Sequence, residues 1–282
     1  MRQSQQLFLV FLSTLIGSCQ ERTASKPTIT TAIKNTVTSK TTDTLTIDLV
    51  ALQKQGKLLH TTVITINNDP VYHSVKHFNA FPLQELLNTY PAIRDLDATK
   101  YQIVFECEDG YKPVMPLQQF LSKKSYLAVS DVDAPKGELW SKIIKDGHEM
   151  KAAPFYLIYE DVSTMETDFK WPYNLIKIHF VDSASDSSLY PKGNKKAQAG
   201  FKLFKKNCVT CHAINTIGGK MGPELNYPKS VTEYWDKNQL KAFIKNPEAF
   251  RNGVKMPTLA HLTEKEIEDI TVYLTYMANH KS

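Results

Sequence analysis

Two cysteines three positions apart, followed directly by a histidine, constrain this chain more than any other feature. In the segment CVTCH the cysteines are Cys208 and Cys211, and the histidine is His212. This spacing lets each cysteine form a thioether with a haem vinyl group, and it places the imidazole where it can bind the iron. We therefore predict one covalently attached haem c with His212 as an axial ligand.

A CxxC pair also occurs in thioredoxin-like redox sites and as half of a zinc site. Thioredoxin-like chemistry requires the pair at the N-terminus of a helix, whereas residues 200–207, which precede it here, have the apolar spacing of a helix. A zinc site requires a second ligand pair, and no CxxC or HxxxH follows in the sequence. Haem attachment is therefore the preferred interpretation.

The N-terminus carries the features of an export signal. An apolar run over residues 7–16 follows Arg2 and is about half as long as a membrane span, which matches the h-region of a signal peptide. The segment IGSC over 16–19 resembles a bacterial lipobox, and an ordinary signal peptide cut nearby is the alternative. We expect a lipid on Cys19 to anchor the protein on the periplasmic side of a bacterial membrane, either inner or outer.

One of the four cysteines is not used by these predictions. Export places the chain where disulfides form, but pairing Cys107 would require another cysteine to lose its predicted role. Because free cysteine is among the most buried residue types, Cys107 is predicted to be a buried structural thiol.

Two polar segments divide the chain. Residues 21–46 are crowded with Thr, Ser and Lys and cannot bury enough surface to offset the entropy of ordering them. Residues 182–196 are similarly poor in apolar side chains and contain turn residues. The predicted organisation is a signal peptide over 1–18, a flexible tether over 19–46, a domain over 47–182, a linker over 183–195 and a second domain over 196–282.

The formal net charge of +5 is unevenly distributed. Residues 192–282 contain 15 Lys or Arg and 8 Asp or Glu, a net charge of +7, which leaves −2 for the rest of the chain. A basic domain would be steered towards an acidic docking face on a redox partner protein. The alternative is that these lysines only solvate helices, and nucleic acid is not expected as a partner.

The helical pattern before CVTCH carries Gly200 and Phe204, and a capping-box pattern of Thr263 and Glu266 predicts the start of the last helix. These features resemble the class I c-type cytochromes from residue 196 onward, which implies an all-α domain. In that family a glycine and an aromatic residue let the first and last helices cross closely. A glycine inside a helix costs about 1 kcal/mol relative to alanine, so a packing reason is expected for it.

The same resemblance implies the second axial ligand. Met256, followed by a proline just before the last helix, matches the family's distal methionine, and a thioether ligand raises the reduction potential. Met221 is the rival, because the loop from His212 is long enough to reach the iron. The segment GPEL over 222–225 favours Met256, since it resembles the family's proximal segment, in which the carbonyl of Pro223 accepts the Nδ1 proton of the histidine.

Four further side chains have open roles. Trp235 and Tyr227 are expected either to wall the haem and cap its propionates or to take part in ordinary core packing. His73 and His77 are four residues apart and could offer a metal or second-haem site on a helix. The interpretation preferred here is a loop with two solvated or hydrogen-bonded histidines.

Residues 60–181 alternate short apolar runs with turn signals, which is typical of an α+β domain. The predicted strands cover residues 63–66, 101–105, 126–129, 155–159 and 176–181. The predicted short helices cover residues 82–87 and 116–121.

Segments in this region resemble, in the same order, the molybdopterin-binding domain of the sulfite oxidase family. They are FPLQELL over 81–87, DGY over 109–111, MPL over 115–117, LA over 127–128, FKW over 169–171 and IKI over 176–178. In that family a cysteine thiolate binds molybdenum, but the equivalent place here, TINN over 65–68, has no cysteine, and Cys107 lies downstream. The family's enzymatic activity is therefore not carried over, and molybdopterin is not expected as a cofactor.

Together these predictions describe an exported, membrane-tethered carrier that moves one electron at a time, and we expect an electron-transfer protein rather than an enzyme. One alternative is a molybdenum-dependent oxidoreductase that holds the metal through a noncysteine ligand and passes electrons to the fused haem. A haem-based sensor or assembly factor is the other.

Overall fold

A computed structural model of the chain describes residues 44–58, 60–145, 147–163 and 165–281. These residues build separate hydrophobic cores, with one set of buried side chains drawn from residues 45–180 and another from 189–277. The chain therefore has more than one domain and a mixed α and β content. The predicted signal peptide, Cys19 and all but three residues of the predicted tether lie outside the described residues.

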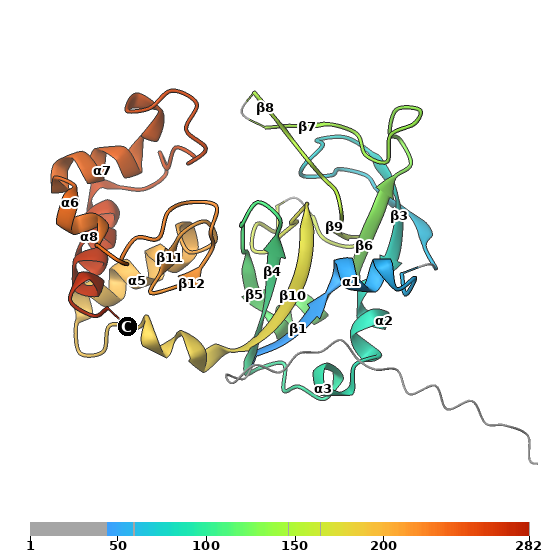
Figure 1. Ribbon diagram of the computed structural model, residues 1–282, viewed down its shortest axis with the longest axis horizontal. Coiled ribbons are helices and arrows are strands. Elements are labelled where there is room, and N and C mark those ends of the chain that lie inside the picture. Colours follow the sequence, from blue (N-terminus) through green and yellow to red (C-terminus); the bar gives the residue numbers. More distant parts are fainter. Residues whose placement is uncertain (1–43, 59, 146, 164, 282) are drawn as a thin grey trace, which may run out of the picture. The chain divides into compact units, whose positions relative to one another are not determined.

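The N-terminal domain is built on two four-stranded antiparallel sheets (Figure 1). The strands of the first, in the order in which they lie side by side, are β1 (Thr44–Asp48), β10 (Leu175–Asp182), β4 (Tyr101–Cys107) and β5 (Val114–Pro116). Those of the second are β2 (Thr62–Ile66), β3 (Lys76–Pro82), β6 (Ser125–Asp131) and β9 (Tyr156–Tyr159). A separate hairpin joins β7 (Ile143–Lys145) to β8 (His148–Met150).

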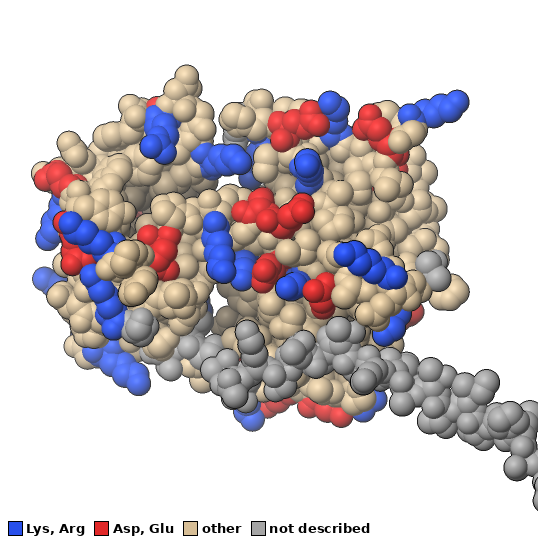
Figure 2. Space-filling model, in the orientation of Figure 1, with Lys and Arg blue, Asp and Glu red and all other residues tan. Residues whose placement is uncertain are grey.

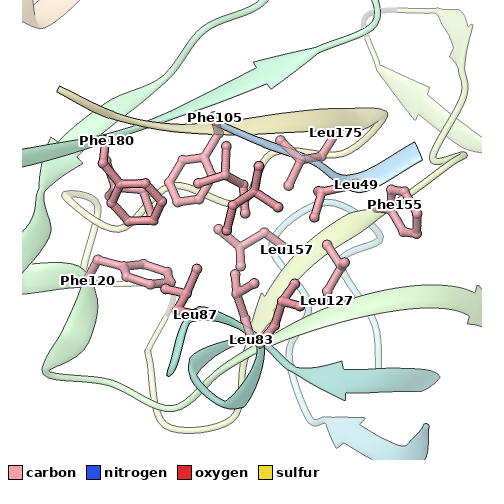
Figure 3. Close-up of a cluster of buried hydrophobic side chains, with 14 of the residues drawn as sticks. Leu49, Leu83, Leu87, Phe105, Phe120, Leu127, Phe155, Leu157, Leu175 and Phe180 are labelled. Carbon is pink, nitrogen blue, oxygen red and sulfur yellow. The ribbon is translucent and has the colours of Figure 1, made fainter. Parts of the chain in front are cut away.

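Apolar residues at alternate positions of these strands form the domain core (Figure 3). Ile103 and Phe105 of β4 and Phe180 of β10 are fully buried, because successive strand residues point to opposite faces of the sheet. Short helices contribute Leu83 and Leu87 to the same core. The helices of this domain are α1 (Leu49–Lys54), α2 (Leu83–Asn88), α3 (Pro91–Arg94) and α4 (Leu117–Leu121).

The strands and helices predicted for residues 60–181 are present, with ends that differ by a few residues. Strand β3 was not predicted, because its sequence KHFNAFP places a lysine, Lys76, at a buried position in line with Phe78 and Ala80. A correction concerns the tether, whose last three residues belong to β1. They pair with residues 179–181 of β10, and the alternation that buries Ile47 and packs Leu45 against the core explains why they are ordered.

The C-terminal domain consists of four α-helices, a short 3₁₀ helix (Pro247–Ala249) and a short hairpin (Figure 1). The helices are α5 (Lys195–Asn207), α6 (Val231–Tyr234), α7 (Lys237–Lys245) and α8 (Glu264–Ala278). Strands β11 (Ala213–Ile214) and β12 (Ile217–Gly218) pair through a two-residue turn, so the expectation of an all-α domain is wrong in this detail. Both turn residues, Asn215 and Thr216, have positive φ angles of 51° and 69°, which is the geometry of a tight hairpin turn.

Helices α5 and α8 cross where the sequence places its helical glycine. A Cβ atom on Gly200 would lie 1.9 Å from the carbonyl oxygen of Asp269 and 2.7 Å from the Cβ of Tyr273, so only glycine permits this approach. The rings of Phe204 and Tyr273 pack beside it with centroids 5.4 Å apart. The predicted capping box of Thr263 and Glu266 is confirmed at the start of α8.

The segment predicted as a linker is partly ordered. Residues Ser183–Ser188 form a 3₁₀ turn, and the next residue, Leu189, is only 1% exposed because it packs in the C-terminal core. The carbonyl of Leu189 also accepts a hydrogen bond from the hydroxyl of Tyr273 at 3.1 Å. Leu189 therefore belongs to the C-terminal domain. Among the described helices, none combines the length and the apolar character needed to cross a membrane.

Candidate haem-binding site

The CVTCH segment forms a turn at the C-terminal end of α5. Cys208 is the C-cap residue of this helix, and its carbonyl accepts hydrogen bonds from the amides of Cys211 and His212 at 3.1 and 2.9 Å. A helix C-terminus carries partial negative charge, which disfavours a thiolate. Burial also raises the pKa of Cys208 to about 12 and raises that of Cys211. These thiols therefore lack the lowered pKa that thioredoxin-like chemistry requires.

A cavity of about 540 Å³ opens beside this turn, within the range of about 300–1,000 Å³ that is typical of small-molecule and cofactor sites. The surrounding side chains are mostly apolar and come from α5 to α8 and the connecting loops. They include the predicted site residues Cys208, Cys211, His212, Pro223 and Met256, together with Phe204, Leu225, Val231, Leu240, Phe243, Ile244, Leu259, Ile270 and Leu274. Two thiols and an imidazole at an apolar cavity are the donor set that a covalently attached haem requires, so the residues present fit this group.

His212 is held by its Nδ1 atom, which lies 2.8 Å from the carbonyl oxygen of Pro223. A carbonyl can only accept, so the proton resides on Nδ1 and the Nε2 lone pair is left for a metal. Burial lowers the pKa of His212, although the Pro223 hydrogen bond and the charge of Glu224 oppose this effect. The histidine is thus kept in the neutral form that binds iron.

Gly222 lies against the imidazole ring. A Cβ atom at this position would come within 2.3 Å of Cε1 and 2.6 Å of Nδ1 of His212. Any larger residue would therefore displace the ring from its place at the cavity.

Both methionines that were considered for the second axial position line the cavity. The sulfur of Met221 lies 3.9 Å from Sγ of Cys211, so this residue is part of the wall that carries the attachment cysteines. Met256 is half-buried and packs against the C-terminal core from the loop before α8. The assignment of Met256 as the ligand stays a prediction.

The two aromatic residues with open roles differ in position. Trp235 lines the cavity, and its ring packs edge to face against Phe243 with centroids 5.0 Å apart. Tyr227 is 58% exposed and is not among the lining residues, whereas Tyr234, which was not predicted, is one of them.

Sequence reasoning also missed polar residues around the cavity. Arg251 and Lys255 line it from the loop that carries Met256. Glu224 follows Pro223 and accepts hydrogen bonds from four backbone amides, two in its own loop and two in the turn between β11 and β12. In the sequence, the only signals for these residues are the basic side chains of Arg251 and Lys255 shortly before Met256 and the acidic side chain of Glu224 after the GP pair. Their roles could not be predicted, because the groups that they contact are distant along the chain or belong to the backbone.

In the N-terminal domain, Cys107 is 2% exposed in the core, and burial raises the pKa of its thiol. His73 lies in a turn with φ of 54°, and His77 is in β3 with Nδ1 3.1 Å from a carboxylate oxygen of Asp133. The two histidines do not share a helix. Within the described ranges, no three His, Cys, Asp or Glu side chains are grouped to hold a metal ion.

A family profile described as "Cytochrome C oxidase, cbb3-type, subunit III" matches residues 195–274. The chain is 30% identical over 105 residues to the cytochrome c of Kluyveromyces lactis, in a match that covers 30% of this chain and 92% of that protein. It is 28% identical over 102 residues to the cytochrome c of Gossypium barbadense, covering 30% of this chain and 90% of the relative.

The chain is also similar to cytochrome c oxidase subunit 2 of Alkalihalophilus pseudofirmus, at 30% identity over 84 residues. This match covers 28% of the chain but only 25% of the oxidase subunit. The chain thus spans about a quarter of the oxidase subunits and nearly the whole of the two cytochrome c proteins.

Proposed function

Because this chain belongs to the cytochrome c family through its C-terminal region, we propose that it is a one-electron carrier with a single haem c bound to Cys208 and Cys211. His212 and Met256 are the proposed axial ligands. The observation that carries this proposal is the apolar cavity lined by all four of these residues. Haem iron, when bound there, supplies the ferric and ferrous states between which one electron is exchanged.

The protein's own residues adjust that exchange. The Pro223 carbonyl fixes the orientation of the His212 ring and raises the basicity of Nε2 through the Nδ1 hydrogen bond. A thioether from Met256 favours the ferrous state. The walls of the cavity are mostly apolar, which is the surrounding expected for a group that changes its charge without binding a substrate.

We also propose that the carrier exchanges electrons with a partner protein that has an acidic docking face. The net charge of +7 over residues 192–282 supports this partner, because opposite charges speed the encounter of two proteins. Figure 2 shows lysine and arginine side chains interspersed with acidic ones on the face drawn there. Lysines that only solvate helices would give the same distribution of charge. The salt dependence of electron transfer decides between these lysines and a docking surface for an acidic partner, because only docking by charge is slowed by salt.

For the rest of the chain we propose a sulfite-oxidase-like N-terminal domain that docks a protein or binds a small ligand without molybdenum. The sequence TINN at residues 65–68 offers no thiolate, and Cys107 is buried in the core with a raised pKa. Export and lipid anchoring at Cys19 on the periplasmic side of a bacterial membrane complete the proposal.

The test uses the whole protein, purified from cells that attach haem c. We expect its mass to correspond to one haem per chain, and a variant with serine at both Cys208 and Cys211 to carry none. Spectra of the wild type and of Met256→Ala in both redox states should show that the sixth ligand is lost in the variant. Met221→Leu is the matched control and should retain it.

Three outcomes would overturn parts of this proposal. Haem retained by the double serine variant would refute covalent attachment, and an unchanged sixth ligand in Met256→Ala would refute the axial assignment. One molybdenum atom per haem, measured by elemental analysis on the same sample, would replace the simple carrier with a molybdenum-dependent oxidoreductase.

A further inference from the structure

Glu224 is the residue directly after the one whose carbonyl holds His212. Its Oε1 atom accepts hydrogen bonds from the amides of Asn215, Asn226 and Tyr227 at 3.0, 3.0 and 3.3 Å. Its Oε2 atom accepts another from the amide of Thr216 at 3.1 Å. One carboxylate therefore joins the turn of the β11–β12 hairpin to the loop that carries Pro223.

This arrangement satisfies backbone groups that the hairpin leaves unpaired. Asn215 and Thr216 form the turn between Ile214 and Ile217, the last paired residues of the hairpin, so their amides lie outside the ladder and need another acceptor. Bonds to a charged acceptor are stronger than those between neutral groups. Glu224 therefore fixes the loop more firmly than a neutral side chain could.

A second set of bonds ties the same loop to the last helix. The side-chain amide of the buried Asn226 donates to Oδ1 of Asn215 at 2.7 Å and to the carbonyl of Met277 at 2.8 Å. Asn215 in turn donates to the carbonyl of His280 at 2.8 Å. The loop that carries Pro223 is thus bonded both to α8 and to the β11–β12 hairpin. Its Pro223 carbonyl therefore has little freedom to move away from His212.

We propose that Glu224 is a positioning residue that lowers the reduction potential of the haem by fixing the hydrogen bond between Pro223 and His212. This inference rests on the proposed function, since it assumes His212 as an axial ligand. A well-held carbonyl makes the imidazole a stronger donor, which favours ferric iron. The Glu224 carboxylate also places a negative charge near His212. A negative charge close to the iron favours the ferric state, because that state is the more positive one.

The test is a spectroelectrochemical titration of the whole haem-loaded protein. At the wild-type midpoint potential, where ferric and ferrous forms are equal, we expect the ferrous-to-ferric ratio of Glu224→Gln to be at least three. Glutamine keeps the size of the side chain but removes its charge and replaces one acceptor by a donor that faces the amide of Thr216. We also expect the Nδ1 proton of His212 to exchange faster with solvent in NMR spectra of the ferrous variant.

Glu266→Gln is the matched control. Its carboxylate also accepts a backbone amide, that of Thr263, but this bond caps α8 and does not involve the loop that carries Pro223. The control should keep the wild-type ferric-to-ferrous ratio even if it lowers the melting temperature. If Glu224→Gln does not accumulate with haem, Glu224→Asp keeps the charge with a shorter reach and should shift the ratio in the same direction by a smaller factor.

The results separate this inference from the function on which it rests. A wild-type protein without attached haem or without a low-spin six-coordinate spectrum would refute the proposed function. A wild-type protein with these properties, combined with variants at Glu224 that keep its ferric-to-ferrous ratio, would refute only the positioning role. An equal shift in Glu266→Gln would also refute it, because any lost carboxylate would then have the same effect.

Discussion

At the scale of single residues, the geometry around His212 depends on Gly222, which has no side chain. Gly222 lets the backbone lie against the imidazole, while the Pro223 carbonyl, one residue on, accepts from Nδ1. A ring that is hydrogen-bonded through Nδ1 and also packed against the Gly222 backbone has few orientations left. The two neighbouring residues therefore act together, one by its carbonyl and the other by its lack of a Cβ atom.

This contact gives the first prediction. Gly222→Ala would place Cβ 2.3 Å from Cε1, so we expect the His212 ring to be displaced, axial coordination to weaken and stability to fall by about 1–3 kcal/mol. Absorption spectra in both redox states and thermal unfolding measure the two effects. Gly193→Ala is the control, because it has no atom within 4 Å of its added Cβ, and its φ of 77° costs stability without touching the haem site. An unchanged Gly222→Ala spectrum would contradict the prediction.

At the scale of elements, the first sheet of the N-terminal domain is cross-linked by a row of polar side chains. Thr46 of β1 lies 2.8 Å from Nδ1 of His179 on β10, and Nε2 of His179 lies 2.8 Å from Glu106 on β4. Lys112 forms an ion pair with the same carboxylate at 2.9 Å. The hydrogen bond from His179, followed by the contacts of Lys112, lowers the pKa of Glu106 to about 2 despite partial burial.

A pH dependence follows from this shift. Because the pKa of Glu106 is lower in the folded state than its ordinary value of 4.5, the ionised group stabilises the sheet above that value, and the stability is lost as the pH falls towards about 2. We expect the urea midpoint of the N-terminal domain to fall between pH 5 and pH 3 in the wild type, and less steeply in Glu106→Gln. Glu85→Gln, at an exposed position of α2, should retain the wild-type slope. Equal slopes in all three proteins would be inconsistent with this role.

At the scale of the whole molecule, the hydrophobic core of the N-terminal domain and that of the C-terminal domain have no side chain in common. The C-terminal core begins at Leu189, six residues before α5, and includes the hydrogen bond from Tyr273 to the Leu189 carbonyl. Asn194 then caps α5 by accepting from the amide of Ala197. The C-terminal folding unit should therefore begin at Leu189 and not at residue 196, where the composition of the chain changes.

Two fragments test this boundary. We expect residues 189–282 to fold and attach haem, and residues 194–282, which keep the Asn194 cap, to be less stable by roughly 2–4 kcal/mol. Most of the loss comes from the buried Leu189 side chain and its hydrogen bond, and smaller parts come from the packing of Tyr190 on Phe201 and the hydrogen bond from Gln198 to the Pro191 carbonyl. Chemical unfolding of both haem-loaded fragments measures the difference, and a longer fragment starting at residue 183 should match 189–282. Equal stability of the two shorter fragments would show that Leu189 does not belong to the core.

The features that could be read from the sequence are those whose partners are close along the chain. The capping box joins Thr263 to Glu266 within one helical turn, and the strands of the N-terminal domain follow from alternation of neighbouring residues. Strand β3 was missed because one of the three positions on its buried face is a lysine, Lys76, so the apolar alternation is too short to recognise. The turn of the β11–β12 hairpin was missed because it uses Asn and Thr in place of glycine.

By itself, the sequence predicts the chemistry of this protein: the CVTCH segment and, through the family resemblance, a methionine before the last helix indicate a haem site. Only the tertiary structure decided how that site is built. The walls of the cavity come from residues as far apart as Phe204 and Leu274. The contact of Gly222 with His212 and the hydrogen bonds that Glu224 accepts involve backbone atoms, which every residue has. Such contacts form only when the whole chain has folded, so their energies leave no periodic or local trace in the sequence.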